Sequence, residues 1–338
     1  MKKILSVILC CCLLLSGGAL TVNASIDRAS SPIIEEQAAE EMMEFISVDN
    51  VTGEVCLAEL SYTPEARAMS NGTIGNVHPG YVPESLMVAN DGANQRGIVG
   101  DDGRVLIPYT QMFPYSAICC LKAEYIGTDG KPYISWGTAW MIGPNIAVTA
   151  AHCVYDRDSG SNMTITGFWP GKMGVLNPFG TGSVINVKYP AKFITNDETK
   201  YDWAVLTLAD ADLGYDTGWF GFGWTSSYPE EENYIITGYP CDTENGVWER
   251  FMYTASGIIS GGTTPAENAL EGTTLFHKID TGSGQSGAPM YDSAYTVYGI
   301  HQKKFSNTTN TAVRITLAIF TCLERIEEIT EITDVVFP

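Results

Sequence analysis

The segment AVTAAHC at residues 147–153 takes a short run of strand-forming residues directly to a histidine. Two later segments have a related form. YDWAVL at residues 201–206 begins a similar run with an aspartate, and GSGQSGAP at residues 282–289 presents a serine on a glycine-rich turn. The chain order is therefore His, Asp, Ser, with each residue at the end of a predicted strand or on a turn.

These three residue types are the ones that nucleophilic acyl transfer needs. A serine hydroxyl needs an imidazole to take its proton, and a carboxylate to orient that imidazole and stabilise its cation. We therefore assign Ser286 as the candidate nucleophile, His152 as its base and Asp202 as the orienting carboxylate. Backbone N–H groups must also face the oxyanion, and Gly284 and Gly287 leave room for them because glycine has no Cβ.

Other readings of the same segments are weaker. Residues 282–287 also spell G-x-G-x-x-G, but a dinucleotide site needs a following helix, and Pro289 comes at once. The acidic segment 210–216 resembles the start of a calcium loop, but its twelfth position is Gly221, so we interpret it as an acidic loop. Four His and no C-x-x-C pair disfavour zinc. We expect no metal and no cofactor.

From residue 98 onward the pattern predicts an all-β protein, either a sandwich or a double barrel. Short runs rich in β-branched and aromatic residues alternate with Gly, Pro, Asn and Asp. These runs lie at residues 115–121, 139–142, 147–149, 203–208, 234–237, 257–259, 297–300 and 312–315. Helical spacing of apolar residues returns at 317–329, which predicts a closing C-terminal helix over about 316–330.

Composition limits the partners and the location. The 338 residues have a formal net charge of −20, which repels phosphate backbones and anionic lipids, so neither nucleic acid nor a membrane is an expected partner. Residues 1–24 combine a basic start, an apolar run and small residues at a cleavage site, as in a secretory signal peptide. We expect a secreted, extracellular and monomeric protein.

Residues 25–96 differ in character from the rest, because they are acidic and contain few basic residues. Residues 33–45 lack Gly and Pro and favour a helix, whereas residues 61–97 are rich in Pro, Gly and Asn and favour a linker. We interpret 25–96 as a pro-segment and 97–338 as the functional domain.

The cysteines of residues 97–338 favour disulfides in an exported protein, but their odd number leaves at least one thiol unpaired. They are Cys119, Cys120, Cys153, Cys241 and Cys322. Cys153 can bridge to Cys119 or Cys120, or stay free, and the sequence leaves these alternatives open.

Together these segments resemble the secreted bacterial glutamyl endopeptidases, which are chymotrypsin-fold serine proteases. The similarity runs from about residue 97 to about residue 329. It includes TAWMIGP at 138–144, TAAHC at 149–153, TGYP at 237–240 and GQSG at 284–287. The resemblance implies two six-stranded antiparallel β-barrels with the site between them, and a C-terminal helix. It also implies a triad of His152, Asp202 and Ser286. The oxyanion hole would then be the N–H groups of Gly284 and Ser286.

The same resemblance implies a pocket for an acidic side chain. Thr281 and His301 correspond to the Thr and His that hold a substrate carboxylate in these enzymes. A hydroxyl donates one hydrogen bond, and an imidazole donates another and can carry charge at mild pH. The family's mature amino terminus lies near this pocket, which here implies cleavage after Arg96 and a free ammonium at Gly97. Unlike relatives, this chain follows His301 with long side chains at 302–304, which would crowd the substrate or add positive potential.

We therefore expect a serine endopeptidase, made as a zymogen and activated by another protease. It would hydrolyse protein or peptide substrates after Glu and less readily after Asp. One alternative is the same triad with a different side-chain preference. Another is a binding protein of this fold with a vestigial triad, which a serine-directed probe would distinguish because it labels only a reactive Ser286.

Overall fold

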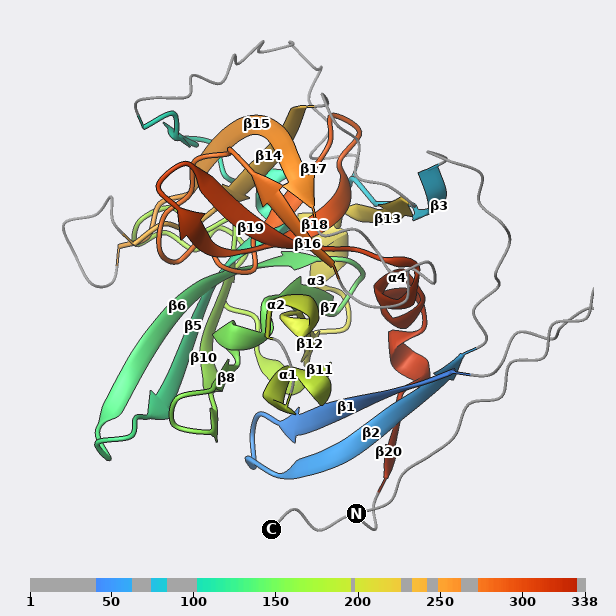
Figure 1. Cartoon of the computed structure of the whole chain (residues 1–338). Coiled ribbons are helices and arrows are strands. Elements are labelled where there is room, and N and C mark those ends of the chain that lie inside the picture. The colour runs from blue at the N-terminus through green and yellow to red at the C-terminus, as the bar shows by residue number, and fades with distance from the viewer. Residues whose placement is uncertain are drawn as a thin grey trace, which may run out of the picture. The chain divides into compact units, whose positions relative to one another are not determined.

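Antiparallel strands dominate the computed structural model, which describes residues 41–62, 74–83, 102–195, 198–225, 233–241, 249–262 and 273–332. The strands form two large sheets and one small hairpin (Figure 1). The predicted all-β class is therefore confirmed for the part of the chain that the structure describes. The predicted signal peptide, residues 1–24, lies outside the described residues.

The first sheet contains nine strands, and all its neighbouring pairs are antiparallel. Their order across the sheet is β10 (Thr164–Pro170), β5 (Ile118–Ile126), β6 (Pro132–Met141), β7 (Ile146–Thr149), β12 (Ala204–Leu208), β11 (Val184–Pro190), β1 (Glu41–Asp49), β2 (Val55–Tyr62) and β20 (Thr330–Ile332). The long buried stretches of β5, β6 and β7 explain the apolar runs that predicted strands there.

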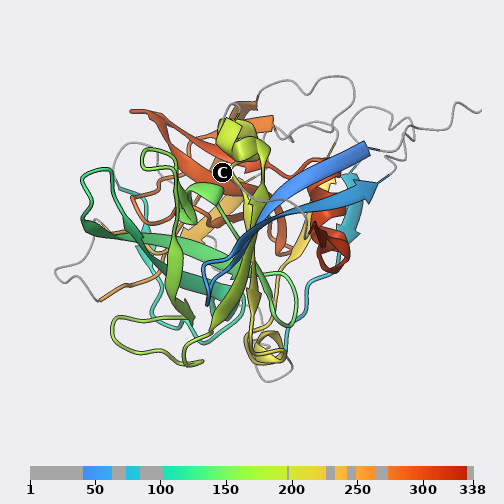
Figure 2. The ribbon, with the colours of Figure 1, turned by 90° about the horizontal axis from the view of Figure 1, so that it is seen from below.

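The hairpin of β1 and β2 comes from the predicted pro-segment, yet it is part of this sheet. β1 pairs with β11, with Phe45 opposite Pro190, and Figure 2 shows the blue hairpin alongside the yellow-green strands. The Phe45 ring meets the Trp203 ring edge-on, with 5.8 Å between centroids. The expected helix over 33–45 is therefore wrong for residues 41–45, because pairing with β11 and burial outweigh local helix propensity. Residues 33–40 lie outside the described part.

The second sheet closes on itself. Its order is β17 (Pro289–Tyr291), β14 (Asn233–Gly238), β15 (Tyr253–Gly262), β16 (Thr273–His277), β19 (Thr309–Arg314), β18 (Thr296–Ser306), β13 (Gly221–Thr225) and β3 (Ile74–His78), with β4 (Val105–Leu106) paired to β15. An additional pairing of β17 with β18 joins the first six of these strands into a barrel.

The expectation of two six-stranded barrels is therefore correct for one sheet only. Six strands of the first sheet, from β10 to β11, match the expected number, but pairing does not close them. The physical reason is that β11 already pairs on both edges, with β12 and with β1. In the described residues no edge of β11 is left for β10.

Helices are few and short in the described ranges. They are α1 (Lys192–Thr195), α2 (Glu198–Tyr201), α3 (Leu213–Thr217) and α4 (Leu317–Glu324), with 3₁₀ turns η2 (Tyr115–Ala117), η3 (Ala151–Cys153) and η4 (Ile326–Glu328); the small hairpin is β8 (Tyr155–Asp156) with β9 (Ser161–Asn162). The Thr316 side chain caps α4 by accepting from the Ile319 N–H at 3.4 Å. None of these helices is long and apolar enough to cross a bilayer.

The C-terminal helix is shorter than predicted. It ends at Glu324 instead of near residue 330, because the chain turns through η4 into β20. β20 then pairs with β2, with Glu331 opposite Ala58. The C-terminal segment therefore covers the outer edge of the hairpin, which would otherwise expose unpaired backbone groups. The acidic segment 210–216 is a loop or turn over residues 210–212, as interpreted, and helical from Leu213, where α3 begins.

Replacing Phe45 with alanine tests whether the hairpin is part of the folded domain. The Phe45 side chain is 0% exposed, so its removal should lower the free energy of unfolding by about 3–5 kcal/mol. Met42 lies on the same strand but is 58% exposed, and Met42→Ala should change that free energy by less than about 0.5 kcal/mol. Denaturant unfolding of both variants measures the difference. Equal, small effects would show that β1 does not pack on β11 in solution.

Candidate active site

β7 and β12 bring His152 and Asp202 to the same end of two neighbouring strands in the first sheet. The two strands are antiparallel neighbours, with Thr149 opposite Ala204. His152 lies in η3 just after β7, and Asp202 lies just before β12. The register of this strand pair therefore places both residues at the same end of the two strands. The sequence placed each residue at the end of its own predicted strand, and strand pairing brings the two ends together.

Two hydrogen bonds join these residues. The His152 backbone N–H donates to Asp202 Oδ1 at 2.9 Å, and His152 Nδ1 lies 2.7 Å from Asp202 Oδ2. Because a carboxylate only accepts, Nδ1 carries the proton, and Nε2 is left as the basic nitrogen. The carboxylate is buried, whereas the His152 side chain is 35% exposed and can reach a substrate.

The pair shifts the pKa of each partner. Burial, the largest influence, lowers the pKa of His152, but the Asp202 carboxylate and the Cys153 sulfur outweigh it, so the pKa lies well above the ordinary 6.5. Burial likewise raises the pKa of Asp202, but the imidazolium charge and the hydrogen bonds of His152 reverse this and the pKa is lowered. The site therefore stabilises a cationic imidazole beside an ionised carboxylate.

The Ser286 turn depends on two glycines with positive φ. Gly284 has φ 94° and Gly287 has φ 85°. A Cβ at Gly284 would lie 2.5 Å from the Tyr239 carbonyl oxygen, and one at Gly287 would lie 2.3 Å from the Thr138 carbonyl oxygen. Neither position accepts a side chain, which agrees with the sequence argument for these glycines.

Backbone hydrogen bonds hold this turn from both sheets. Thr138 on β6 donates its N–H to the Ser286 carbonyl at 2.8 Å, and the Gly287 N–H donates to the carbonyl of His301 on β18, also at 2.8 Å. The turn is therefore attached to a strand on either side. Thr138 adds a side-chain bond, from Oγ1 to the Gly284 carbonyl, at 2.9 Å.

The Ser286 hydroxyl donates to the Gln302 carbonyl at 2.9 Å. Among the described residues it has no hydrogen bond to His152. Its hydroxyl must therefore turn away from Gln302 before it can give a proton to the imidazole.

The sequence indicated Gln302 only as a long side chain that would crowd the substrate, and not as a partner of Asp202. Its buried side chain donates from Nε2 to Asp202 Oδ2 at 3.3 Å. The side chain therefore contacts the carboxylate and does not crowd a substrate strand, whereas Lys303 and Lys304 are exposed. The only signal in the sequence was its position next to His301, because strand alternation alone did not indicate which buried group it would meet.

The two predicted acid-pocket residues lie beside the Ser286 turn. Thr281 is half-buried at the start of the turn, and His301 is buried on β18. His301 Nδ1 lies 3.3 Å from Nε2 of His277. Burial lowers the pKa of His277 to about 4, and burial followed by the neighbouring histidines lowers that of His301 well below 6.5. Both rings are therefore neutral at mild pH.

The predicted cleavage site, Arg96 and Gly97, lies outside the described residues. In the described ranges Cys153 forms no disulfide with Cys119 or Cys120. Cys153 Sγ instead lies 3.6 Å from the Ser286 carbonyl oxygen. No group of three or more His, Cys, Asp or Glu in the described ranges is arranged to hold a metal ion.

Comparison with known proteins gives the family. The model of the trypsin-like peptidase domain matches residues 137–300. An "extracellular metalloprotease" of Bacillus subtilis is 33% identical over 230 residues, which cover 66% of this chain and 67% of that protein. A "glutamyl endopeptidase" of Bacillus licheniformis is 30% identical over 200 residues, covering 59% of this chain and 56% of that protein.

A solved structure shares the fold. It is that of a Glu endopeptidase in complex with MPD, which superimposes with a TM-score of 0.58 and 25% sequence identity. The superposition covers 68% of this chain and 99% of the other. The sequence similarity and the fold together place the chain in the family of trypsin-like serine peptidases.

Proposed function

We propose that this chain is a secreted serine endopeptidase in which Ser286 is the nucleophile, His152 the base and Asp202 the orienting carboxylate. The observation that carries the proposal is the pair of hydrogen bonds between His152 and Asp202 at 2.9 and 2.7 Å. They leave the Nε2 nitrogen of an accessible imidazole free to act as a base next to the Ser286 turn.

The chemistry follows from these positions. Nε2 of His152 takes the Ser286 proton as Oγ attacks the scissile carbonyl, and Asp202 stabilises the imidazolium that forms. The N–H groups of Gly284 and Ser286 are the proposed donors to the oxyanion. His152 then returns the proton to the leaving amine, and water hydrolyses the acyl-enzyme through the same groups. Only the neutral imidazole can begin this cycle, so activity should rise with pH through the raised pKa of His152.

Gln302 acts on the same pair. Its amide donates to the oxygen of Asp202 that also accepts from His152 Nδ1. A second donor on this oxygen restrains the carboxylate and keeps it ionised.

For specificity, we propose that the pocket prefers Glu, and Asp less readily, before the scissile bond. Thr281 and His301 would donate hydrogen bonds to the substrate carboxylate. His301 suits this role because it is buried beside the turn and neutral when the site is empty, and an arriving carboxylate would favour its protonated form. Two relatives are named glutamyl endopeptidase and Glu endopeptidase, which supports the preference.

Two alternative functions have specific consequences. A pocket with another side-chain preference would use the same triad but would not distinguish Glu from Gln. A binding protein of this fold would not react with a serine-directed probe. The accessible His152 ring beside the Ser286 turn favours the enzyme.

We propose further that the chain is a zymogen cleaved after Arg96. The Gly103 N–H donates to Asp280 Oδ2 at 2.8 Å, next to Thr281. Chain a few residues past Gly97 therefore lies beside the proposed acid pocket, where a new ammonium would attract a carboxylate. Because β1 pairs along β11, the hairpin should stay bound after that cleavage.

Ser286→Ala tests the nucleophile. It should lower kcat for peptide hydrolysis by at least about a thousandfold and abolish labelling by a fluorophosphonate, because no hydroxyl remains to attack. Ser283→Ala is the matched control, since Ser283 is exposed on the same turn. Near-normal hydrolysis by Ser286→Ala would exclude Ser286 as nucleophile.

The acid pocket is tested with matched Glu and Gln peptides. His301→Ala or Thr281→Val removes a proposed donor to a charged group, so kcat/KM for the Glu peptide should fall about tenfold to a hundredfold. The Gln peptide should lose much less, because its amide is neutral. Equal kcat/KM for the two peptides in the parent enzyme would contradict the Glu preference and leave the triad unaffected.

Arg96→Gln tests the zymogen. It should block processing to Gly97 and leave the chain inactive on peptides, whereas Arg67→Gln should be processed normally. N-terminal sequencing of the active parent species should give Gly97, and a fragment containing residues 41–62 should co-elute with it on gel filtration. A fully active species that begins at Ser25 would refute the switch.

A further inference from the structure

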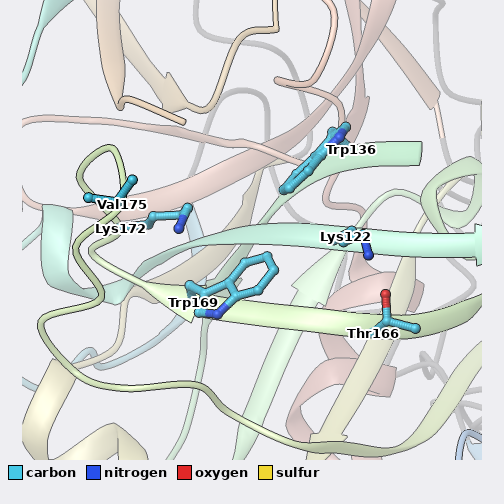
Figure 3. A pocket seen from close by; sticks show the side chains of 6 residues that line it. All are labelled: Lys122, Trp136, Thr166, Trp169, Lys172 and Val175. Atoms are coloured by element: carbon cyan, nitrogen blue, oxygen red, sulfur yellow. The ribbon is translucent and has the colours of Figure 1, made fainter. Parts of the chain in front are cut away.

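An open pocket lies on the first sheet, away from Thr281 and His301. It measures about 260 Å³ and opens over β5, β6, β10 and the loop that follows β10 (Figure 3). The side chains that line it are Lys122, Trp136, Thr166, Trp169, Lys172 and Val175. No role assigned above uses this pocket.

Two tryptophans form its apolar wall. The rings of Trp136 and Trp169 lie 6.1 Å apart with 28° between their planes. The Trp169 ring folds back over Gly167, where a Cβ would lie 2.0 Å from the ring. A side chain at position 167 would therefore clash with the Trp169 ring in this position. Aromatic walls of this kind reduce the access of water to a bound group, which strengthens charge interactions there.

Three cations surround these rings. Lys172 Nζ lies 4.8 Å from the centroid of the Trp169 ring, and the Arg250 guanidinium carbon lies 4.3 Å from that of Trp136. Lys122 is the cross-strand neighbour of Trp136 and forms an ion pair with Glu124. Lys122, Lys172 and Arg250 are only 8%, 5% and 6% exposed. Such a gathering of buried cations is unexpected in a chain of net charge −20.

The charges of Lys172 and Arg250 repel each other. Burial is the largest cause that lowers the pKa of Lys172. The neighbouring Cys120 sulfur opposes it, and the charge of Arg250, the smallest of the three influences, lowers the pKa further. Lys172 Nζ donates to the neutral amide oxygen of Asn177 at 2.9 Å. An anion entering the pocket would offset this repulsion.

The pocket adjoins the Ser286 turn through β6. Gly137 directly follows Trp136, and a Cβ there would lie 2.9 Å from Cys153 Sγ and 3.5 Å from the Ser286 carbonyl oxygen. β6 and β18 bind opposite sides of the turn, and His301 of the proposed acid pocket is on β18. If His152 protonates the leaving amine, as proposed above, the β6 side next to Cys153 is the side on which the rest of the substrate departs.

We propose that this pocket binds an acidic side chain of the substrate on the carboxyl side of the scissile bond, within its first three residues. The inference rests on the proposed peptidase function and adds a second specificity site to it. Lys172, which lines the pocket, supplies the charge, and Arg250 adds to it from its position against the Trp136 ring. The Trp136 and Trp169 rings enclose the aliphatic part of the Asp or Glu side chain.

The test uses processed enzyme and quenched fluorescent peptides that all have Glu before the scissile bond. Asp, Asn or Lys is placed in turn at each of the first three positions after the bond, and the active concentration is titrated with a fluorophosphonate. The parent should show kcat/KM about tenfold higher for Asp than for Asn at one of these positions, and lower for Lys.

Variants then assign the effect to the pocket. Lys172→Met and Arg250→Met should each reduce the Asp to Asn ratio to less than about threefold. Lys131→Met removes the same charge from a side chain that is 73% exposed beyond β5, and its ratio should stay within about twofold of the parent value.

Three results would overturn the inference. The first is an Asp to Asn ratio near one at all three positions in a parent that cleaves Glu peptides, which leaves the proposed function intact and needs no variant to fold. The second is an unchanged ratio in both Lys172→Met and Arg250→Met. The third is a parent that neither cleaves nor reacts with the fluorophosphonate, which would refute the proposed function as well.

Discussion

The buried carboxylate of Asp202 is the constraint on which the rest of the site depends. An ionised carboxylate out of water costs several kcal/mol unless donors replace its hydration. Here the replacements are two N–H groups of His152 and the amide of Gln302. His152 comes from the first sheet and Gln302 from the second, so the contacts that compensate for burial also connect the two sheets. The same contacts set the tautomer of the imidazole, which ties stability and catalytic chemistry to one group.

The Ser286 turn is the second element held between the sheets. Its carbonyl accepts from Thr138 on β6, and the next N–H donates to His301 on β18. With Gly284 and Gly287 at positive φ, the backbone follows a path that no side chain at these positions would permit. β18 carries His301 of the proposed acid pocket, and β6 carries Trp136 of the pocket that contains Trp169 and Lys172. Under the two proposals above, a turn held between two strands would align substrate groups on both sides of the scissile bond.

The β1–β2 hairpin changes how the region before residue 97 is understood. A segment with acidic composition and a predicted linker would normally be peripheral, but β1 covers the edge of β11 and β20 covers that of β2. Phe45 on β1 packs against Trp203, the neighbour of Asp202. Packing of the hairpin is therefore transmitted directly to the segment that positions the carboxylate, and covering the β11 edge also protects a long sheet from association.

Much of the site was readable from sequence because its signals are local. The histidine after β7, the aspartate before β12 and the glycines around Ser286 each depend on strand ends or on backbone sterics, which a short segment expresses by itself. The all-β class follows in the same way from runs of β-branched and aromatic residues. Other features were decided only by the tertiary structure. They are the number and closure of the barrels, the hairpin at 41–62, the early end of α4 at Glu324, the Gln302 contact and the His277–His301 pair. Each of these depends on which strand edge or which buried group a segment meets from far along the chain, and pairing energy and burial at such contacts exceed local propensity.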